Sequence, residues 1–289
     1  MKSSFLVRLA GLVGVLTLAW VAYTQAPPTP PPFVLHKVAD DLFVIDGGGA
    51  GNVAVYVTGE GVILVDDKFD RNFAEIMANI KKVTDQPVKY VINTHYHADH
   101  SGGNTNFAPA GAQIISTTLA RQHILNKIQP GAPANMVPAS ITFDNQMSVF
   151  LGGKEVRAMH LGRGHTGTDA LVYFPARRVL HSGDLVTGGT PLIDYAAGGS
   201  IVEWTKTLDK AMSVVEWDTL IPGHGPVSPK TMMVTYRNNA ETLRNRVQAE
   251  VRAGKSEAEL AAFMLAEYKW APNSLNITMS LKGMMAELK

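Results

Sequence analysis

Six consecutive residues at positions 95–100 read HYHADH and contain four side chains that are able to bind a metal ion. A buried imidazole or carboxylate is costly unless a partner satisfies it, and the usual partner of several imidazoles and a carboxylate is a metal ion. His95 and His97 alternate, so both can point the same way from the end of a strand. The turn that follows can direct Asp99 and His100 toward a second point nearby. We therefore predict a metal site at this position.

Three more candidate ligands lie later in the chain, and each has glycine neighbours. His165 lies in the run GRGHTGTD, Asp184 in HSGDL and His224 in IPGHGP. Each run follows or ends an apolar segment, and glycine allows a close backbone approach or a positive φ. The remaining four histidines are expected to be surface or core residues: His36, His123, His160 and His181.

The apolar patterns indicate the elements that position these residues. Strands in the first half indicate an antiparallel meander, and turn glycines separate several of them: 34–38, 42–45, 52–58 and 62–65. The turn Gly47–Gly49 is either a plain hairpin turn or a mobile flap beside the site. A helix with apolar residues at helical spacing follows over 73–83, and the strand Val88–Ile92 then delivers the HYHADH run.

The second half repeats this order of strands followed by a helix. Its strands are expected over 148–151, 155–161, 170–174 and 178–181, and a helix face follows over 204–215. The strand Thr219–Ile221 then delivers His224. Beyond it lie three amphipathic segments, Lys230–Ala253, Ser256–Tyr268 and Ile277–Leu288, which predict a C-terminal helical extension over 230–289 that packs on the domain.

These motifs together resemble the metallo-β-lactamase superfamily. The HYHADH run, the glycine-flanked His165, the later Asp184 and the PGHG run around His224 occur in that family's order and at compatible spacings. The resemblance extends from about Phe33 to about Pro229. It implies an α/β (α+β) protein with a four-layer αβ/βα sandwich, in which two mixed sheets pack face to face and helices cover them. The metal site would lie at one edge of this 33–229 domain.

The resemblance also implies two zinc ions per chain, with iron or manganese as alternatives. The implied ligands form two groups with one carboxylate between them: His95, His97 and His165 for the first ion, Asp99, His100 and His224 for the second, and Asp184 bridging both. Three protein ligands leave one position open, as catalytic zinc sites do. A hydroxide between the ions would attack a carbonyl, and Asp99 would be the catalytic residue that orients it. Three further residues are expected to support the ligands by hydrogen bonds: Asp66, Thr166 and Asp169.

Composition narrows the classes of function. The chain has 289 residues, of which 46% are hydrophobic and 18% are charged, as in an ordinary globular protein. Its 26 basic and 25 acidic residues give a net charge of +1, which leaves no electrostatic footprint for nucleic acid. There is no cysteine, so disulfides and thiolate ligands are excluded. The remaining imidazole and carboxylate ligands suit zinc, iron and manganese.

The first 26 residues are typical of a targeting segment. Lys2 and Arg8 precede the almost wholly apolar stretch Leu9–Tyr23, which has the length of a signal-peptide core and is short for a membrane span. Residues 1–26 are therefore a signal peptide of an exported, periplasmic protein or an uncleaved N-terminal anchor. The anchor would be the only contact with a membrane. The proline-rich segment Pro27–Pro32 is expected to be a stiff linker.

Three functions compete for this site. The first is hydrolysis of a small molecule with a hydrolysable carbonyl, such as a β-lactam or other cyclic amide, a lactone, an ester or a thioester. Asp184 and Thr187 stand where many zinc β-lactamases have a different metal ligand and a substrate-binding lysine, so a general hydrolase fits better than a dedicated β-lactamase. The second is redox chemistry at a single iron, which would leave the second group of ligands unused. The third is a non-enzymatic metal-binding module, which would be expected to have lost ligands.

Overall fold

A computed structural model describes residues 30–289 of the chain. The predicted signal peptide or anchor and the first residues of the predicted linker lie outside this range. Within the described range, no helix is long and apolar enough to cross a bilayer. Residues 31–289 form one compact unit.

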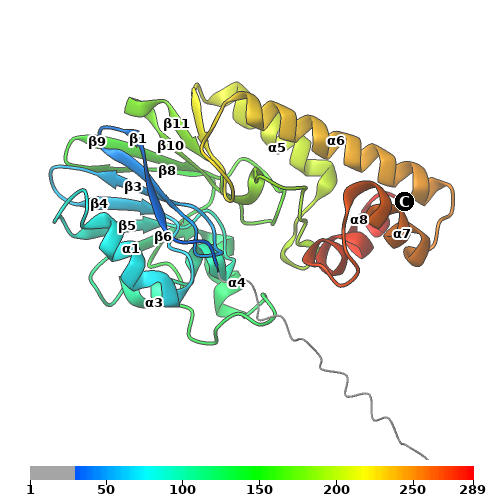
Figure 1. Ribbon diagram of the computed structural model, residues 1–289, viewed down its shortest axis with the longest axis horizontal. Helices are drawn as coiled ribbons and strands as arrows, with labels where there is room; N and C mark the ends of the chain where they lie inside the picture. Colours follow the sequence, from blue (N-terminus) through cyan, green and yellow to red (C-terminus); the bar gives the residue numbers. More distant parts are fainter. Residues whose placement is uncertain (1–29) are drawn as a thin grey trace, which may run out of the picture. The chain divides into compact units, whose positions relative to one another are not determined.

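Residues 30–289 contain thirteen strands. They form two sheets (Figure 1). The first sheet has the order β1-β2-β3-β4-β5-β6-β7. Its strands are β1 (Val34–Ala39), β2 (Leu42–Asp46), β3 (Val53–Val57), β4 (Val62–Val65), β5 (Val88–Ile92), β6 (Gln113–Thr117) and β7 (Ile141–Phe143). The antiparallel meander of β1 to β4 is present as predicted, and β4 to β7 continue in parallel.

The second sheet has the order β13-β12-β11-β10-β9-β8. Its strands are β8 (Gln146–Leu151), β9 (Lys154–Met159), β10 (Leu171–Phe174), β11 (Val179–His181), β12 (Thr219–Ile221) and β13 (Ser228–Pro229). In this sheet β11 and β12 pair in parallel, and the other described neighbours pair antiparallel. Strand β11 begins one residue later than predicted because Arg178 has a left-handed backbone, with φ of 51°, and ends a 3-10 turn.

The helices cover the outer faces of the two sheets. They are α1 (Phe73–Ile80), α2 (Ala98–Ser101), α3 (Asn104–Phe107), α4 (Thr118–Leu125), α5 (Ile201–Val214), α6 (Thr231–Arg252), α7 (Glu257–Tyr268) and α8 (Lys282–Glu287). Short 3-10 turns occupy Asp70–Asn72, Pro175–Arg177, Gly183–Leu185 and Tyr195–Ala197, and η5 is a π-helix over Asn276–Leu281. Figure 1 shows α1 and α3 beside the first sheet and α5 running alongside α6.

Alternation along the central strands explains the four layers. In β4, Ile63 and Val65 pack into the core between the sheets, whereas Val62 and Leu64 pack on the opposite side with the Ile76 side chain of α1. Successive side chains of a strand point to opposite faces, so a strand covered on both faces is apolar throughout. Strand β10 repeats this pattern between the sheet core and α5. The predicted four-layer αβ/βα sandwich is thereby confirmed.

The C-terminal helices share a core with the second sheet and α5. Buried residues of α6, α7 and α8 belong to one apolar cluster with residues of β10 and α5: Leu243, Leu260 and Met284 with Leu171 and Trp204. The single helix predicted over 277–288 is wrong in detail. The backbone forms the π-helix η5 first and changes to an α-helix at Lys282. The buried side chain of Ser280 in η5 is hydrogen-bonded to the backbone of Ile193, outside the extension.

Candidate metal centre

The ends of parallel strands bring the motifs to one edge of the sandwich. Strands β4 and β5 are parallel neighbours; Asp66 directly follows β4, and two residues separate the end of β5 from the HYHADH run. In the second sheet, β11 and β12 are parallel neighbours and lead to Asp184 and His224. Carboxyl ends of neighbouring parallel strands meet at the same edge of a sheet, which is where α/β proteins commonly bind ligands. His165 joins them from the loop between β9 and β10.

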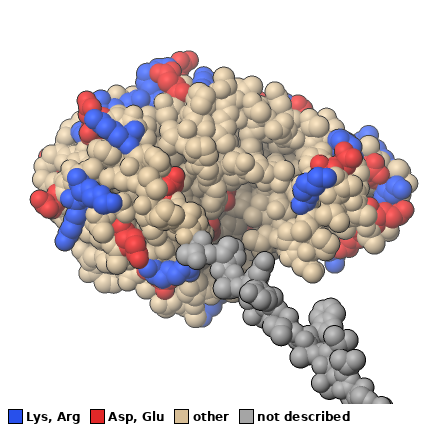
Figure 2. Space-filling model, viewed as in Figure 1, with Lys and Arg blue, Asp and Glu red and all other residues tan. Residues whose placement is uncertain are grey.

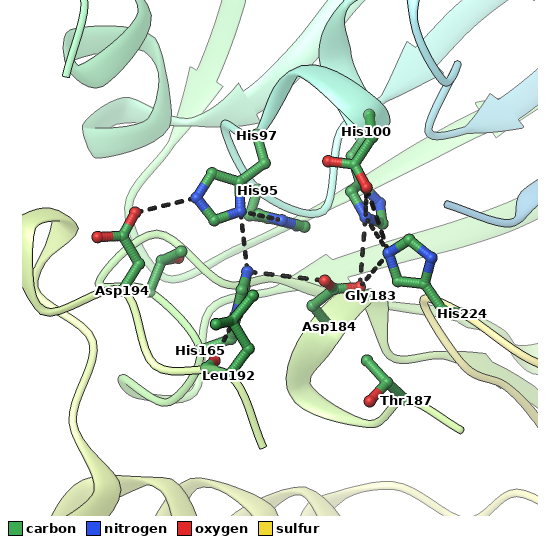
Figure 3. Close-up of polar contacts among 12 residues, drawn as sticks. His95, His97, His100, His165, Gly183, Asp184, Thr187, Leu192, Asp194 and His224 are labelled. Carbon is green, nitrogen blue, oxygen red and sulfur yellow. Dashed lines mark hydrogen bonds and ion pairs between the residues drawn. The ribbon is translucent and has the colours of Figure 1, made fainter. Parts of the chain in front are cut away.

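Three buried histidines converge in the first group (Figure 3). The Nδ1 of His97 lies 3.1 Å from Nε2 of His95 and 2.9 Å from Nε2 of His165. All three side chains are buried, and one nitrogen of each is placed so that the three could hold one metal ion. The structure therefore brings together the three residues predicted as ligands of the first ion.

In His165 and His97, the ring nitrogen that faces away from the group has a hydrogen-bond acceptor of its own. This leaves the other ring nitrogen available to bind a cation. The Nδ1 of His165 lies 2.7 Å from the carbonyl oxygen of Leu192, which can only accept a hydrogen bond, so Nδ1 carries the proton. The Nε2 of His97 lies 2.9 Å from a carboxylate oxygen of Asp194. Burial lowers the pKa of His165 to about 4, so this ring is neutral near pH 7 and its only N–H faces Leu192. Its Nε2 lone pair therefore points at the other histidines, as a metal ligand requires.

The second group contains Asp99, His100 and His224. The Nε2 of His224 lies 3.2 Å from Nε2 of His100 and 3.3 Å from Oδ2 of Asp99. Burial opposes the charged form of His224, but the carboxylates of Asp184 and Asp99 outweigh burial and raise its pKa to about 9. This group therefore combines a carboxylate with two imidazoles, a set of metal ligands that suits zinc, iron or manganese.

Asp184 lies between the two groups (Figure 3). Its Oδ2 is 3.7 Å from Nε2 of His165, and its Oδ1 is 3.3 Å from Nε2 of His100 and 3.4 Å from Nε2 of His224. The buried Oδ1 receives no hydrogen bond from any residue in the described part of the chain. A buried carboxylate oxygen without a hydrogen-bond donor is costly, and a bound cation would satisfy it. The residues present thus fit metal ions.

Asp66 supports the HYHADH loop through several hydrogen bonds. Its carboxylate accepts the backbone N–H of Thr94 at 2.7 Å, the hydroxyl of Thr94 at 2.8 Å and Nδ1 of His100 at 2.8 Å. The hydroxyl of Thr94 in turn lies 3.1 Å from Nδ1 of His95. Asp66 is fully buried and has a positive φ of 61°. One carboxylate therefore orients a histidine from each of the two groups.

Thr166 and Asp169 form a closed turn after His165. The carboxylate of Asp169 accepts the backbone N–H of Thr166 at 3.1 and 3.0 Å and the Thr166 hydroxyl at 2.5 Å. Burial raises the pKa of Asp169 to about 7 despite these donors. The hydrogen bonds between Thr166 and Asp169 hold the backbone next to His165. The ring of His165 is oriented by the carbonyl of Leu192. A supporting role of Thr166 and Asp169 would therefore act through the main chain next to His165.

Asp194 is a residue that the sequence motifs did not reveal. Its carboxylate accepts hydrogen bonds from Nε2 of His97 and from the hydroxyl of Tyr96, at 2.9 and 2.5 Å. Burial raises the pKa of Asp194, but these two hydrogen bonds outweigh it and hold the pKa at about 2. Asp194 lies in a loop without a glycine-flanked histidine or any other recognisable motif, so no sequence signal pointed to it.

The four histidines that were not expected to bind metal lie outside all three ligand groups found among residues 30–289. His181 comes nearest to the site. Its Nδ1 accepts the backbone N–H of Gly183 at 3.1 Å, and its Nε2 lies 3.3 Å from the carbonyl oxygen of Asn52. It therefore holds the turn that presents Asp184.

A cavity of about 750 Å³ opens onto the metal centre. Figure 2 shows the surface hollowed between the sandwich and the C-terminal helices. The candidate ligands that line this cavity are His97, Asp99, Asp184 and His224. The other lining residues come from loops, from the 3-10 turn Tyr195–Ala197 and from η5: Gln129, Pro130, Thr187, Gly189, Leu192, Asp194, Ala196, Leu275, Thr278 and Met279. A small molecule in this cavity can reach both ligand groups.

Comparison with known families identifies the class of protein. A family model described as the metallo-beta-lactamase superfamily matches residues 46–224, which include the full candidate ligand set. The chain belongs to this superfamily. It is a metal-dependent hydrolase.

Curated relatives agree with the superfamily assignment, and solved structures share the fold. The chain is 27% identical over 203 residues to the metallo-beta-lactamase type 2 of Elizabethkingia meningoseptica, covering 67% of this chain and 79% of the relative. It is 29% identical over 178 residues to metallo-beta-lactamase IND-1 of Chryseobacterium indologenes, covering 61% of this chain and 72% of the relative. A metallo-beta-lactamase structure from Pontibacter korlensis has a TM-score of 0.64 at 19% identity, covering 73% of this chain and 99% of that one. The DIM-1 structure has a TM-score of 0.62 at 22% identity, covering 74% and 99%. The structures establish the fold.

Proposed function

We propose that this chain is an exported hydrolase that uses two zinc ions to cleave a carbonyl compound with water. The observation that carries the proposal is the placement of Asp184, whose carboxylate lies 3.7 Å from Nε2 of His165 and 3.4 Å from Nε2 of His224. A carboxylate within reach of both ligand groups suits a pair of ions. When bound, such ions lower the pKa of water and draw electron density from a carbonyl.

Asp99 is the residue that we propose to act on the attacking water. Its side chain lines the cavity and is 25% exposed, so it is open to both substrate and solvent. Burial raises its pKa, but the positive charge of His100 and the hydrogen bond from His224 outweigh burial and hold the pKa well below its usual range. The carboxylate is therefore an acceptor at neutral pH. It can orient a water molecule through that water's proton and hold the proton at Oδ2 until the leaving group takes it.

The substrate class follows from the size of the cavity and the names of the relatives. We propose a small molecule: a β-lactam or other cyclic amide, a lactone, an ester or a thioester. The metallo-beta-lactamases of the comparison support the first of these. Thr187 lines the cavity. In several such enzymes a lysine at the matching position binds a substrate carboxylate, so a threonine here supports the lactone, ester and thioester.

The same proposal covers the organisation of the chain. Residues 1–26 act as a signal peptide or an anchor, residues 27–32 as a linker, residues 33–229 as the catalytic domain and residues 230–289 as its helical extension. Secretion to the periplasm would remove residues 1–26. N-terminal sequencing of the protein from a periplasmic extract tests this part, because an intact Met1 would indicate an anchor.

The test combines metal content with activity. The full-length protein is loaded with zinc, iron or manganese, its bound metal is counted by elemental analysis, and hydrolysis of a chromogenic cephalosporin, a lactone and a thioester is measured. The variant His97→Ala removes a ligand of the first group, and His36→Ala is the matched control because His36 is exposed and pairs with Asp46. We expect two zinc ions per chain, with hydrolysis lost in His97→Ala and kept in His36→Ala.

Two results would contradict the proposal. One iron per chain with no hydrolysis of any substrate would favour redox chemistry. Stable metal binding without hydrolysis of any substrate, whichever of the three metals is loaded, would favour a non-enzymatic metal-binding module. Turnover of a lactone or thioester without turnover of the cephalosporin would keep the hydrolase and settle its substrate class.

A further inference from the structure

The C-terminal extension supplies part of the wall of the substrate cavity. Leu275, Thr278 and Met279 line the cavity together with candidate metal ligands. All three lie in the extension, beyond the match to the family model, which ends at residue 224. The catalytic centre and this wall therefore come from separate parts of the chain.

The wall is held firmly against the loop that follows Asp184. Trp270 Nε1 donates to Oγ1 of Thr190 at 2.9 Å, and Asn276 Nδ2 donates to the carbonyl of Pro191 at 3.2 Å. At the end of the chain, the carboxylate of Glu287 accepts the hydroxyl of Tyr195 at 2.7 Å. Trp270 precedes η5, Asn276 is its first residue and Glu287 follows it, so the residues of η5 have a defined position relative to the loop.

Two of the three wall residues, Leu275 and Met279, are apolar. Leu275 is 63% exposed although it is a large apolar residue, and Met279, Leu192 and Ala196 line the same cavity. Exposed apolar side chains grouped in a cavity commonly mark a binding site for an apolar group. None of the described residues that line the cavity is a lysine or an arginine. A substrate with a carboxylate would lack the charged partner that usually binds such a group.

We infer that this cavity selects an ester or thioester with an uncharged hydrocarbon acyl chain, and that Leu275 and Met279 contact this chain. The inference rests on the proposed function and specifies its substrate class. In the reaction, the oxygen of water bonds to the carbonyl carbon and the C–O or C–S bond breaks. The proton of the water passes to the leaving oxygen or sulfur, so the products are a carboxylic acid and an alcohol or thiol.

The experiment measures selectivity for chain length in the zinc-loaded full-length protein. The substrates are p-nitrophenyl esters of acetate, butyrate, hexanoate and octanoate. Burial of one methylene contributes about 0.8 kcal/mol, so kcat/KM should rise about fourfold with each added methylene until the cavity is filled. A chromogenic cephalosporin, which carries a carboxylate, should have a lower kcat/KM than the octanoate ester.

Two variants test the residues themselves. Leu275→Gln and Met279→Gln should each lower the ratio of kcat/KM for octanoate to kcat/KM for acetate about tenfold, because a polar amide then lies against the chain. The matched control is Leu265→Gln, since Leu265 is an exposed leucine of α7 that does not line the cavity. It should leave this ratio unchanged. Leu275 is largely exposed, so its variant is expected to fold even where the Met279 variant does not.

The outcomes separate the inference from the proposed function. Equal kcat/KM for all four esters, or a ratio that is unchanged in Leu275→Gln, would overturn the inference and leave the hydrolase standing. A cephalosporin kcat/KM above that of the octanoate ester would do the same. Absence of hydrolysis of every substrate by the zinc-loaded protein would overturn the proposed function, and this inference with it.

Discussion

The side chain of Ser280 bonds to both backbone groups of Ile193. Its Oγ accepts the N–H of Ile193 at 2.9 Å and donates to the carbonyl of Ile193 at 3.2 Å. Ile193 lies between Leu192, whose carbonyl accepts Nδ1 of His165, and Asp194, whose carboxylate accepts Nε2 of His97. A serine of the C-terminal extension therefore holds the backbone that orients two candidate metal ligands.

The variant Ser280→Ala tests this connection. It leaves the buried N–H of Ile193 without a partner, which should lower the free energy of unfolding by about 1–3 kcal/mol in urea titrations. It should also weaken zinc binding about tenfold in a competition with a chelator. Loss of a group that orients metal-ligating histidines commonly lowers metal affinity by this amount or more. Ser213→Ala is the control, since Ser213 is exposed and its hydroxyl donates to the carbonyl of Lys210 within α5. An unaltered zinc affinity in a destabilised Ser280→Ala would restrict Ser280 to a structural role.

Asp194 should control the metal affinity of His97. In Asp194→Ala, Nε2 of His97 loses its acceptor, so the ring is free to rotate and to move its proton to the nitrogen that faces the other histidines. We expect zinc affinity to fall about 10- to 100-fold, with a smaller loss in Asp194→Asn, which keeps an acceptor oxygen. Asp209→Asn is the control, because Asp209 is exposed and pairs with Arg237. Equal affinities in Asp194→Ala and the control would refute the assignment.

The glycine before His224 is required by the closeness of Asp184. A Cβ atom at Gly223 would lie 2.0 Å from Oδ1 of Asp184 and 2.6 Å from the carbonyl carbon of Gly183. Gly223→Ala should therefore displace Asp184, reduce the number of zinc ions bound per chain and lower kcat. Gly59→Ala serves as the matched control, since a Cβ there meets no atom within 4 Å. Full metal content in Gly223→Ala by elemental analysis would disprove the steric argument.

Lys68 should make stability depend on pH in the alkaline range. Its Nζ donates to the carbonyls of Gly47 and Gly51 at 3.0 and 2.6 Å, and burial lowers its pKa from 10.5 to about 8. Between pH 8 and 10.5 the unfolded chain binds more protons at this lysine than the folded chain, so stability rises with pH. The rise from this group should reach at most about 3 kcal/mol.

Urea titrations at pH 7.5, 9 and 10.5 check this expectation. The difference in unfolding free energy between the wild type and Lys68→Met should change in favour of the wild type as pH increases. Lys210→Met, at an exposed position of α5, should show no such trend. A constant difference for Lys68→Met would mean that the lysine titrates alike in the folded and unfolded chains.

The motif residues could be predicted from the sequence because their chemistry is local and specific. His95, His97 and His100 lie within one short run, and glycines mark the neighbourhoods of Asp184 and His224. The strands and long helices were predictable for a similar reason, since period-2 and period-3.6 apolar patterns reflect burial of one face. The strand β7 was missed because three residues are too short to show such a pattern.

The sequence by itself determined the ligand types, the order of the motifs and the apolar patterns of the two halves, because each depends on neighbouring residues. Only the tertiary structure decided that Asp194 and Leu192 orient the histidines and that Ser280 holds their loop. It also placed Leu275 and Met279 at the cavity. These contacts join residues that lie far apart in the chain, and single hydrogen bonds or apolar contacts between such residues leave no periodic pattern in the sequence. They arise only when the extension packs on the folded sandwich.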